Sequence, residues 1–322
     1  MRELENLFTF KDRTTHMPSV SICIPTFNHG QFIEQSLGSA TAQTFRDTEI
    51  IVLDNASQDD TEEIVAAAAV RDARIRYVRH PQNIGLIGNL NACIEMARGT
   101  YIKLLCADDS LQPDCVSRLV EAFERYSGVR LAGCARAVTD ESLRTLRVAR
   151  ARSEFELVSG DAMIEECFFF GNRIGEPTAV MFRRADSLEG FSDRYTQLPD
   201  MEMWFRLLRG GHFAAIPDAL CQVRSHPQQA TWSNDQSGRI IEDRRRLFRE
   251  YAESAGRSAT LSRKCLWDVR MAYIAARAAA AGYRPGDSCI DELFFPGAYR
   301  PLTFPLIKAM RALGLKLVWK TS

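Results

Sequence analysis

The sequence has no excess of charge of either sign. Lys and Arg together number 41, as do Asp and Glu, so the formal net charge is zero. Proteins that bind nucleic acid usually carry a basic surface, and this balance gives no indication of one. We therefore expect no nucleic-acid partner. Any charged group with a function must act within a local site, because the chain has no overall excess of charge.

Paired cysteines and long apolar runs are also missing. The 9 cysteines form no Cys-x-x-Cys pair and no ligand-like spacing with His, which is typical of a reduced cytosolic protein rather than a disulfide or zinc scaffold. No run approaches the roughly 20 apolar residues that span a bilayer, and Met1 to Met17 is too charged for a signal peptide. These absences predict a soluble, cytoplasmic protein.

Phosphate-binding loops of two common kinds are absent as well. Thr26 to Phe32 contains no Lys or Arg, whereas a sugar nucleotidyltransferase needs a basic, glycine-rich loop after its first strand to hold a triphosphate. Gly85 and Gly88 form no Gly-x-Gly-x-x-Gly and do not follow the first strand. This argues against a dinucleotide-binding oxidoreductase.

The sequence does contain an alternation of strands and helices. At 322 residues and 46% hydrophobic content, it is long enough for one large α/β domain or for a main domain plus a helical appendage. Short apolar runs alternate with helical periodicities, which predicts a mostly parallel sheet. The predicted strands are residues 20–24, 49–53, 75–78 and 101–105. The loops after them, each containing Asp or Asn, are 26–30, 54–57, 83–85 and 107–110. Because parallel strands end at one edge, these loops predict a polar ligand site.

The last of these loops carries two adjacent carboxylates, Asp108 and Asp109. Carboxylates at a strand's end suit a hard divalent cation such as Mg²⁺ or Mn²⁺. Alternatively, one of them caps the helix that follows Pro113. From the residues alone, both interpretations stay open.

The second half of the chain has a less regular pattern. Asp200 falls in the first turn of a predicted helix, where a carboxylate either caps the helix or acts as a catalytic base. Residues 142–156 read as an exposed connection. The other predicted strands are 129–138, 178–182, 213–217 and 220–223, and the other predicted helices are 159–170, 242–251 and 261–281.

The C-terminal segment from Leu302 to Lys320 is apolar with Lys and Arg interspersed. This pattern is compatible with peripheral contact at the inner face of a membrane. We favour the other interpretation, a helix docked on the domain or on a partner chain. A homo-oligomer is left open.

Five motifs in this order resemble glycosyltransferase family 2. They are Pro25-Thr26-Phe27-Asn28, Asp54-Asn55-Ala56-Ser57, Asn83-x-Gly85, Asp108-Asp109, and Asp200 before a helix with Trp204. The resemblance implies a GT-A fold, a Rossmann-like, mostly parallel central sheet flanked by helices, with a C-terminal helical extension. It predicts a lead-in at 1–18, a GT-A domain at 19–233 and an extension at 234–322. Within the domain, 19–140 would form the nucleotide-binding half and 141–233 the acceptor half.

The resemblance also assigns roles to residues of the first half. In the second motif the family commonly has two Asp, and Asn55 replaces the one that accepts a hydrogen bond from the pyrimidine ring; an amide oxygen can still accept it. Asp109 is implied as the metal ligand and Asp108 as the ribose contact. The residues implied in nucleotide binding are Pro25, Thr26, Phe27, Asn28, Asp54, Asn55, Asn83, Gly85 and Asp108.

Further along the chain, the resemblance implies that Asp200 is the catalytic base, with Pro199 in place of the usual Glu or Gly. Glu202 follows two residues later and should face another direction on the helix. His226 matches a position where many members place a His near the diphosphate and metal, although a lone His is also often structural. The segment Gly175–Thr178 and the pair Arg183-Arg184 resemble the part that shapes the acceptor side.

The predicted function is inverting transfer of a sugar from a nucleotide-diphospho-sugar to a hydroxyl of a glycan or lipid-linked saccharide, assisted by Mn²⁺ or Mg²⁺. Two alternatives are retained. One is a sugar nucleotidyltransferase, against which the uncharged loop after the first strand argues. The other is a non-catalytic saccharide-binding or scaffold protein on the same fold, against which the presence of both Asp109 and Asp200 argues.

Overall fold

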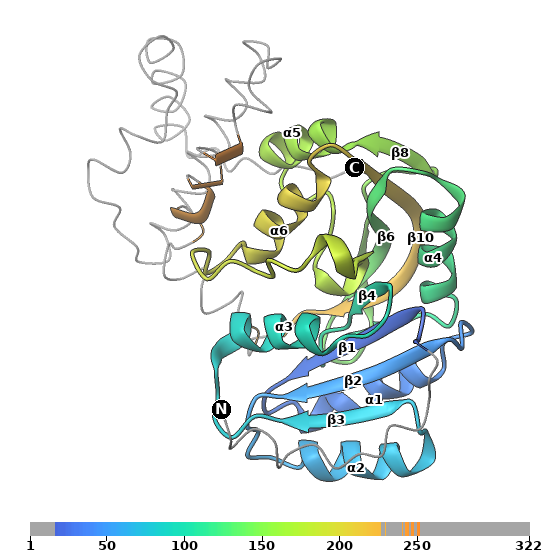
Figure 1. Ribbon diagram of the computed structural model, residues 1–322, viewed down its shortest axis with the longest axis vertical. Helices are drawn as coiled ribbons and strands as arrows, with labels where there is room; N and C mark the ends of the chain where they lie inside the picture. Colours follow the sequence, from blue (N-terminus) through green and yellow to red (C-terminus); the bar gives the residue numbers. More distant parts are fainter. Residues whose placement is uncertain are drawn as a thin grey trace.

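The computed structural model describes residues 17–226, together with 229, 240, 242–244, 246, 247, 250 and 251 (Figure 1). The predicted helix at 261–281, the basic tail and nearly all of the predicted lead-in lie outside the described residues. No helix within the described ranges is long and apolar enough to cross a membrane.

The first half of the chain forms the expected parallel unit. Strands β1, β2 and β3 and helices α1, α2 and α3 alternate, and β4 then pairs with β1. The pairs β1–β2, β1–β4 and β2–β3 are all parallel. The bounds are β1 Val20–Thr26, α1 Gly30–Thr41, β2 Thr48–Asp54, α2 Thr61–Arg71, β3 Ile75–Arg79, α3 Gly85–Met96 and β4 Tyr101–Leu104.

The second half of the chain extends the same sheet with strands of both directions. The sheet order is β3-β2-β1-β4-β9-β6-β10-β5, in which β9 is antiparallel to both β4 and β6, and β10 is parallel to β6. The remaining bounds are β5 Ser110–Leu111, α4 Cys115–Arg125, β6 Val129–Thr139, β7 Thr145–Ala149, β8 Glu156–Ser159, α5 Gly160–Phe170, β9 Val180–Arg183, α6 Pro199–Leu208 and β10 His212–Arg224, with 3₁₀ turns at Pro177–Ala179 and Arg184–Asp186.

Helices cover both faces of this sheet, which explains why its central strands are apolar throughout. All seven residues of β1 are buried. One core cluster joins the strands to α1, α2 and α4, and the other joins them to α3, α5 and α6 (Figure 1). A strand covered on both faces has no polar side, so its sequence reads as a continuous apolar run.

Two segments differ from the pattern expected from the sequence. The exposed connection predicted at 142–156 contains β7, which pairs with β6 along the sheet edge. The predicted strands at 213–217 and 220–223 form one strand, β10, whose register shifts between Ile216 and Ala219 and again before Cys221. These irregularities bend the strand around Pro217 and Asp218 without ending it.

Candidate functional site

Two loops at the carboxyl edge of the sheet are bound to each other through Asn28. Its backbone is left-handed (φ 54°). Its N–H donates to Ser57 Oγ at 2.8 Å, and its Oδ1 accepts from Gln58 N at 2.8 Å. Phe27 beside it is 40% exposed. Thr26 is buried, and its Oγ1 has no hydrogen-bond partner among the described residues. The first loop thus presents an exposed aromatic ring next to a rigid turn.

Asp54 anchors the second loop from within. The strand register sets Pro25 beside Leu53 and Thr26 beside Asp54. The carboxylate of Asp54 is fully buried; Oδ1 accepts from Ser57 N at 2.9 Å and from Ser57 Oγ at 2.5 Å, and Oδ2 accepts from Tyr77 OH at 2.6 Å. Its contribution in this structure is to shape the loop, and its predicted direct contact with a nucleotide stays a prediction.

Asn55 holds the third loop in place. Its Nδ2 donates to Asn83 Oδ1 at 2.9 Å and to Gly85 O at 3.2 Å, while its Oδ1 accepts from Ile84 N at 2.8 Å. Gly85 has φ 81°, a conformation that favours glycine. The amide oxygen expected to face a pyrimidine is therefore already bonded to the loop, with one lone pair left over.

The acid pair is fixed by segments that lie far away in the sequence. Asp109 Oδ2 accepts from Thr178 Oγ1 at 2.5 Å, and Asp109 Oδ1 accepts from Arg224 N at 2.9 Å. Asp108 Oδ2 lies 2.9 Å from His226 Nε2. Helix α4 starts only at Cys115, with Asp114 at its N-cap. The helix-cap interpretation of Asp108 and Asp109 is therefore wrong.

The two carboxyl groups have opposite electrostatic environments. Burial, followed by the nearby charge of Asp108, raises the pKa of Asp109 well above its ordinary value. Burial also acts to raise the pKa of Asp108, but the hydrogen bond from His226 and the charge of His29 outweigh it, so this pKa is lowered. A cation beside the pair would favour ionisation of both groups.

The residues present fit a divalent metal. Ligand atoms of Cys106, Asp108 and Asp109 all lie within 4.8 Å of one another. Burial raises the pKa of the Cys106 thiol well above its ordinary value, so the thiol stays protonated and is a poor ligand. The two carboxylates are left as hard oxygen donors, the kind that Mg²⁺ and Mn²⁺ prefer.

Thr178 connects the acid pair to the rest of the sheet, a role that no motif of the sequence indicated. Its hydroxyl donates to Asp109 and accepts from Cys106 N at 3.0 Å. Its carbonyl accepts from Nζ of Lys103, a fully buried lysine that also donates to Leu104 O at 3.0 Å. The predicted acceptor-side segment Gly175–Thr178 thus supports the acid pair directly.

Arg224 is a second residue of the site that the sequence did not indicate. It lies at the end of β10 and is 7% exposed. Its Nε donates to Asp108 O at 3.0 Å, its Nη2 donates to Gln35 Oε1 at 2.5 Å, and the guanidinium lies 4.6 Å from the ring centroid of Phe32. Only its position two residues before His226 could have drawn attention to it.

Asp200 lies where the sequence placed it, in the first turn of α6. Leu198 is the N-cap, and among the described residues Asp200 accepts a hydrogen bond from the adjacent Met201 N–H, at 2.8 Å. It is partly buried. Burial is the main reason that its pKa is raised to about 7. A carboxyl group with this pKa can accept a proton near neutral pH, as a general base must.

Glu176 links Asp200 to the acid pair. Its charge raises the pKa of both Asp109 and Asp200, so one residue lies within electrostatic reach of the two. Glu176 itself pairs with Arg136, whose side chain is buried. Hydrogen bonds of the same segment connect the acid pair with α6: Thr178 donates to Asp109 Oδ2, and Gly175 O accepts from Trp204 Nε1 of α6 at 3.1 Å.

Two other predictions have different outcomes. Arg183 pairs in register with Tyr101, the first residue of β4, and its guanidinium lies over the rings of Tyr101 and Phe123. Arg183 therefore lies at the edge of the sheet where β4 begins, whereas the acid pair lies at the edge where β4 ends. The expected contribution of Arg183 to the acceptor side is wrong. Glu202 points away from Asp200 as expected, toward Arg206 and Tyr251.

Comparison with known proteins identifies the family. A sequence model described as Glycosyl transferase family 2 matches residues 21–189, more than half of the chain. This chain belongs to glycosyl transferase family 2. It is therefore a glycosyltransferase, and the matched segment contains the first four motifs and ends before Asp200.

Curated proteins similar to this chain include named glycosyltransferases. An uncharacterised protein of Mycobacterium tuberculosis is 34% identical over 241 residues, covering 72% of this chain and 75% of the relative. An uncharacterised glycosyltransferase of Haemophilus influenzae is 26% identical, covering 66% and 68%. A shorter match, 38% identical and covering 35% and 37%, is to the GalNAc(5)-diNAcBac-PP-undecaprenol beta-1,3-glucosyltransferase of Campylobacter jejuni.

Solved structures show the same fold. TarS residues 1–349 of S. aureus, in complex with UDP-GlcNAc, has a TM-score of 0.59 at 13% identity, covering 93% of each chain. A mannosyltransferase from Pyrobaculum calidifontis, in complex with GDP-Man and Mn²⁺, has a TM-score of 0.57 at 18% identity, covering 96% of this chain and 89% of its own. The predicted GT-A fold is confirmed.

Proposed function

We propose that this family 2 glycosyltransferase moves a sugar, with inversion, from a nucleotide-diphospho-sugar to a hydroxyl group of a saccharide acceptor. The observation that carries the proposal is the segment Gly175–Thr178, which is hydrogen-bonded both to Asp109 and to Trp204 of α6, the helix that contains Asp200. This segment joins a carboxyl group with a pKa near 7, Asp200, to a carboxylate pair that fits a metal. Solved proteins of this fold contain UDP-GlcNAc, or GDP-Man with Mn²⁺.

In the proposed mechanism Asp200 takes the proton from the acceptor hydroxyl as that oxygen attacks the anomeric carbon. General-base assistance of this kind is typically worth ~10²–10⁴-fold in rate. Asp109, with Asp108 beside it, would hold the metal. When bound, a divalent cation neutralises charge on the departing diphosphate. Thr178 and Arg224 keep Asp109 in place through the two hydrogen bonds described above.

For His226 the structure supports a positioning role. Its Nε2 faces Asp108 Oδ2, and it does not belong to the cluster of possible ligands formed by Cys106, Asp108 and Asp109. We propose that it orients Asp108, the predicted ribose contact. Direct ligation of the metal by His226 stays a prediction.

A panel of nucleotide sugars tests the proposal, with release of nucleoside diphosphate measured in the presence and absence of Mn²⁺. Asp200→Asn should lower transfer by at least about a hundredfold while donor binding survives. Asp109→Ala should abolish metal-dependent nucleotide binding. Release of inorganic pyrophosphate from a triphosphate would instead identify a nucleotidyltransferase, and binding without any release would identify a non-catalytic protein.

The proposed acceptor is a glycan or a lipid-linked saccharide. The relative from Campylobacter jejuni carries an undecaprenol-linked saccharide in its name, but it matches only about a third of this chain. Cellular extracts of lipid-linked saccharides, added to the donor assay, would show whether such an acceptor raises the rate of diphosphate release.

A further inference from the structure

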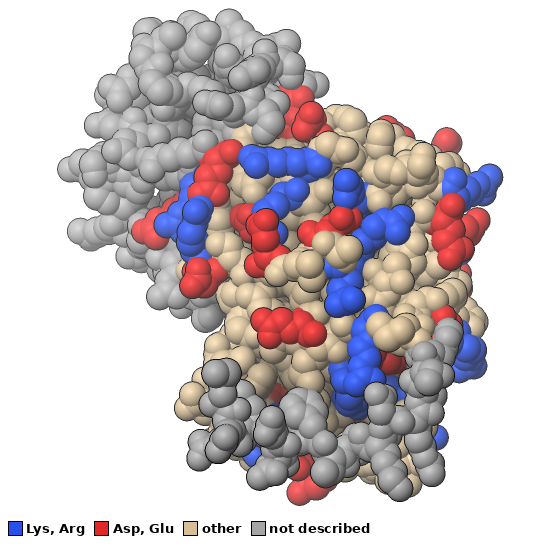
Figure 2. Space-filling model, viewed as in Figure 1, with Lys and Arg blue, Asp and Glu red and all other residues tan. Residues whose placement is uncertain are grey.

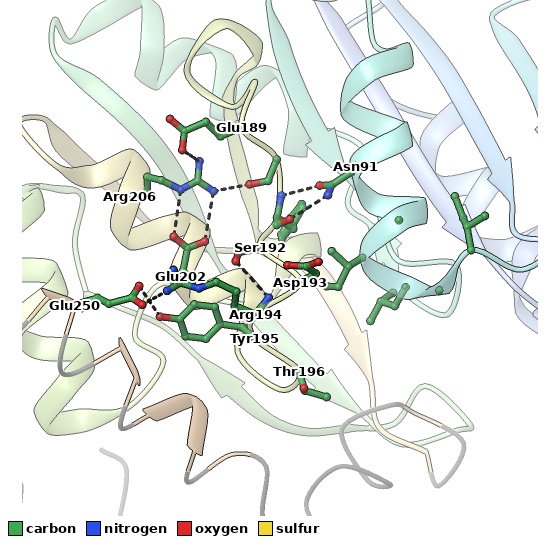
Figure 3. A pocket seen from close by; sticks show the side chains of 17 residues that line it. Asn91, Glu189, Ser192, Asp193, Arg194, Tyr195, Thr196, Glu202, Arg206 and Glu250 are labelled. Atoms are coloured by element: carbon green, nitrogen blue, oxygen red, sulfur yellow. Dashed lines mark hydrogen bonds and ion pairs between the residues drawn. The ribbon is translucent and has the colours of Figure 1, made fainter. Parts of the chain in front are cut away.

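A cavity of about 910 Å³ lies between the first turn of α3, the loop 189–196 and α6 (Figure 3). Its size is that of a site for a small ligand. One wall is Ile84–Gly88 of α3, another is the loop 189–196, and the third comprises Glu202, Arg206 and Glu250. Of these lining residues, Ile84 and Gly85 belong to the predicted loop 83–85, and none belongs to the acid pair.

The cavity lies between the donor half and the candidate base. Ile84 and Gly85 are held by Asn55 of the second loop. On the other side, Thr196 is followed by Gln197 and Leu198, and the N–H groups of all three donate to one oxygen, Asp243 Oδ2. Asp200 comes two residues later. The lining thus includes residues held by the second loop on one side and residues of α6, the helix that contains Asp200, on the other.

The loop that forms its wall is preorganised. Asn91 of α3 binds the backbone of Phe191 twice, accepting from its N–H at 2.6 Å and donating to its carbonyl at 3.0 Å. Gly190 has φ 67°, and a Cβ added there would lie 2.5 Å from Asn91 Oδ1. Arg206 also donates to Gly190 O. A wall fixed in this way loses little entropy when a ligand binds.

The charges of the lining exclude a diphosphate. Four carboxylates face two guanidinium groups, an excess of two negative charges. Both guanidinium groups are already paired, Arg206 with Glu202 and Glu189, and Arg194 with Glu250. Asp193 is exposed and makes no hydrogen bond or ion pair with any described residue. An anionic ligand would meet uncompensated carboxylate charge.

The remaining polar and apolar groups suit a sugar ring. Ile84 and Leu86, 41% and 53% exposed, offer apolar surface on one side. Asp193 on the other side can accept hydrogen bonds from hydroxyl groups, and charged acceptors make the stronger ones. Sugars combine apolar C–H faces with hydroxyl donors in the same way.

We propose that this cavity binds an uncharged saccharide unit of the acceptor. The inference rests on the proposed function and adds the acceptor's chemical class and its place. It predicts that neutral hexosides are bound and that hexuronides and sugar phosphates are excluded. Binding of the neutral hexosides and exclusion of the charged sugars can be tested separately.

Saturation-transfer NMR on the full chain, with methyl glucoside, methyl N-acetylglucosaminide and methyl glucuronide at about 20 mM, gives the readout. The neutral glycosides should receive saturation and the glucuronide should not. Leu86→Ser should reduce the signal about fivefold by removing apolar contact. Leu188→Ser changes a leucine that is 73% exposed and does not line the cavity, so it should have no effect.

Charge reversal provides the second arm. Asp193→Lys removes the excess of two negative charges, so the glucuronide should then be bound about as well as the neutral sugars. Glu154→Lys, at an exposed residue away from the cavity, should leave the exclusion intact. Diphosphate release by the wild-type protein, with water as acceptor, tests the proposed function independently. The inference is overturned if no neutral glycoside receives saturation, if the wild type binds the glucuronide equally, or if Leu86→Ser and Asp193→Lys match their controls.

Discussion

Asp200 owes its raised pKa mainly to burial, and no basic side chain among the described residues pairs with its carboxylate. Burial raises its pKa to about 7, and the hydrogen bond from Met201 only partly offsets this. Glu176 raises it further, while Arg136 lowers it. Because Arg136 is paired with Glu176, the opposite effects of the two charges on the pKa of Asp200 partly cancel.

The raised pKa predicts a pH profile for transfer. A base acts in its deprotonated form, so kcat/KM should increase about tenfold per pH unit up to pH 7 and level off above it. Glu176→Gln removes a charge that raises this pKa and should move the inflection to lower pH. Glu154→Gln, at an exposed site, is the control. A rate that stays constant down to pH 5 would contradict Asp200 as the base.

The raised pKa of Asp200 also predicts that the folded state loses stability when this carboxyl group ionises. A carboxyl group whose folded pKa lies above its unfolded value favours the folded state below the unfolded pKa, and this contribution is lost as pH rises through about 7. Asn cannot ionise, so Asp200→Asn should gain in Tm relative to the wild type as pH increases from 4 to 8. Thermal unfolding of both proteins at pH 4 and pH 8 measures this change in Tm. If the difference in Tm between variant and wild type were the same at both pH values, the raised pKa of Asp200 would be contradicted.

Thr178 should control the metal affinity through Asp109. Thr178→Val keeps the shape but removes the hydroxyl that donates to Asp109 Oδ2, and losses of 10–100-fold in affinity are typical for such supporting groups. Calorimetry with Mn²⁺ and UDP would measure it. Thr178→Ser retains the hydroxyl and should remain close to the wild type. Equal affinity in the Val variant would remove Thr178 from the metal site.

At the scale of elements, the contact between α3 and the loop 189–196 is the most specific one near the site. Gly190→Ala should destabilise the fold by about 2 kcal/mol or more, because it combines a left-handed backbone with a clash against Asn91 Oδ1. Gly38→Ala in α1 meets no atom within 4 Å and should stabilise slightly. Urea unfolding compares the two. If the two variants had similar free energies of unfolding, the loop 189–196 would be able to accommodate a Cβ at position 190 without strain.

The elements that the sequence predicted are those with a strong burial pattern. Strands β1, β2 and β4 are buried on both faces, and Ser159 caps α5 through a bond from Ala162 N, a signal that the sequence shows directly. Strand β7 has almost no buried residue, so its pairing with β6 left no periodicity to detect.

The site was predictable only where its motifs are local. Asp109 and Asp200 stand at strand and helix ends that periodicity reveals. Thr178 and Arg224, which hold Asp109, lie 69 and 115 residues from it along the chain. No spacing rule links such residues, because the contact depends on the sheet order. The packing of Arg183 on Tyr101 was missed for the same reason, since β9 runs antiparallel.

At the scale of the whole molecule, the positive and negative charges of the sequence balance. Figure 2 shows acidic and basic side chains mixed on the visible face, in agreement with the zero net charge. The basic tail, the segment for which the sequence suggests attraction to an anionic membrane, lies outside the described residues. A tail docked on protein gives no such attraction.

Flotation with anionic liposomes tests the tail. Since we favour docking on protein, the full chain and a chain ending near Pro285 should both stay at the bottom of the gradient. Neutral liposomes provide the control for trapping. Flotation of the full chain alone, suppressed by salt, would show instead that the tail binds the membrane surface.

The position of β10 in the sheet has a consequence for the timing of synthesis. Its last residue, Arg224, completes the support of Asp109, and His226 follows directly. A growing chain on the ribosome can complete its first four strands early, but the bond to Asp109 must wait until β10 has left the exit tunnel and docked. We therefore expect a nascent chain to hold Asp109 in the geometry of the site only after β10 has docked on the sheet.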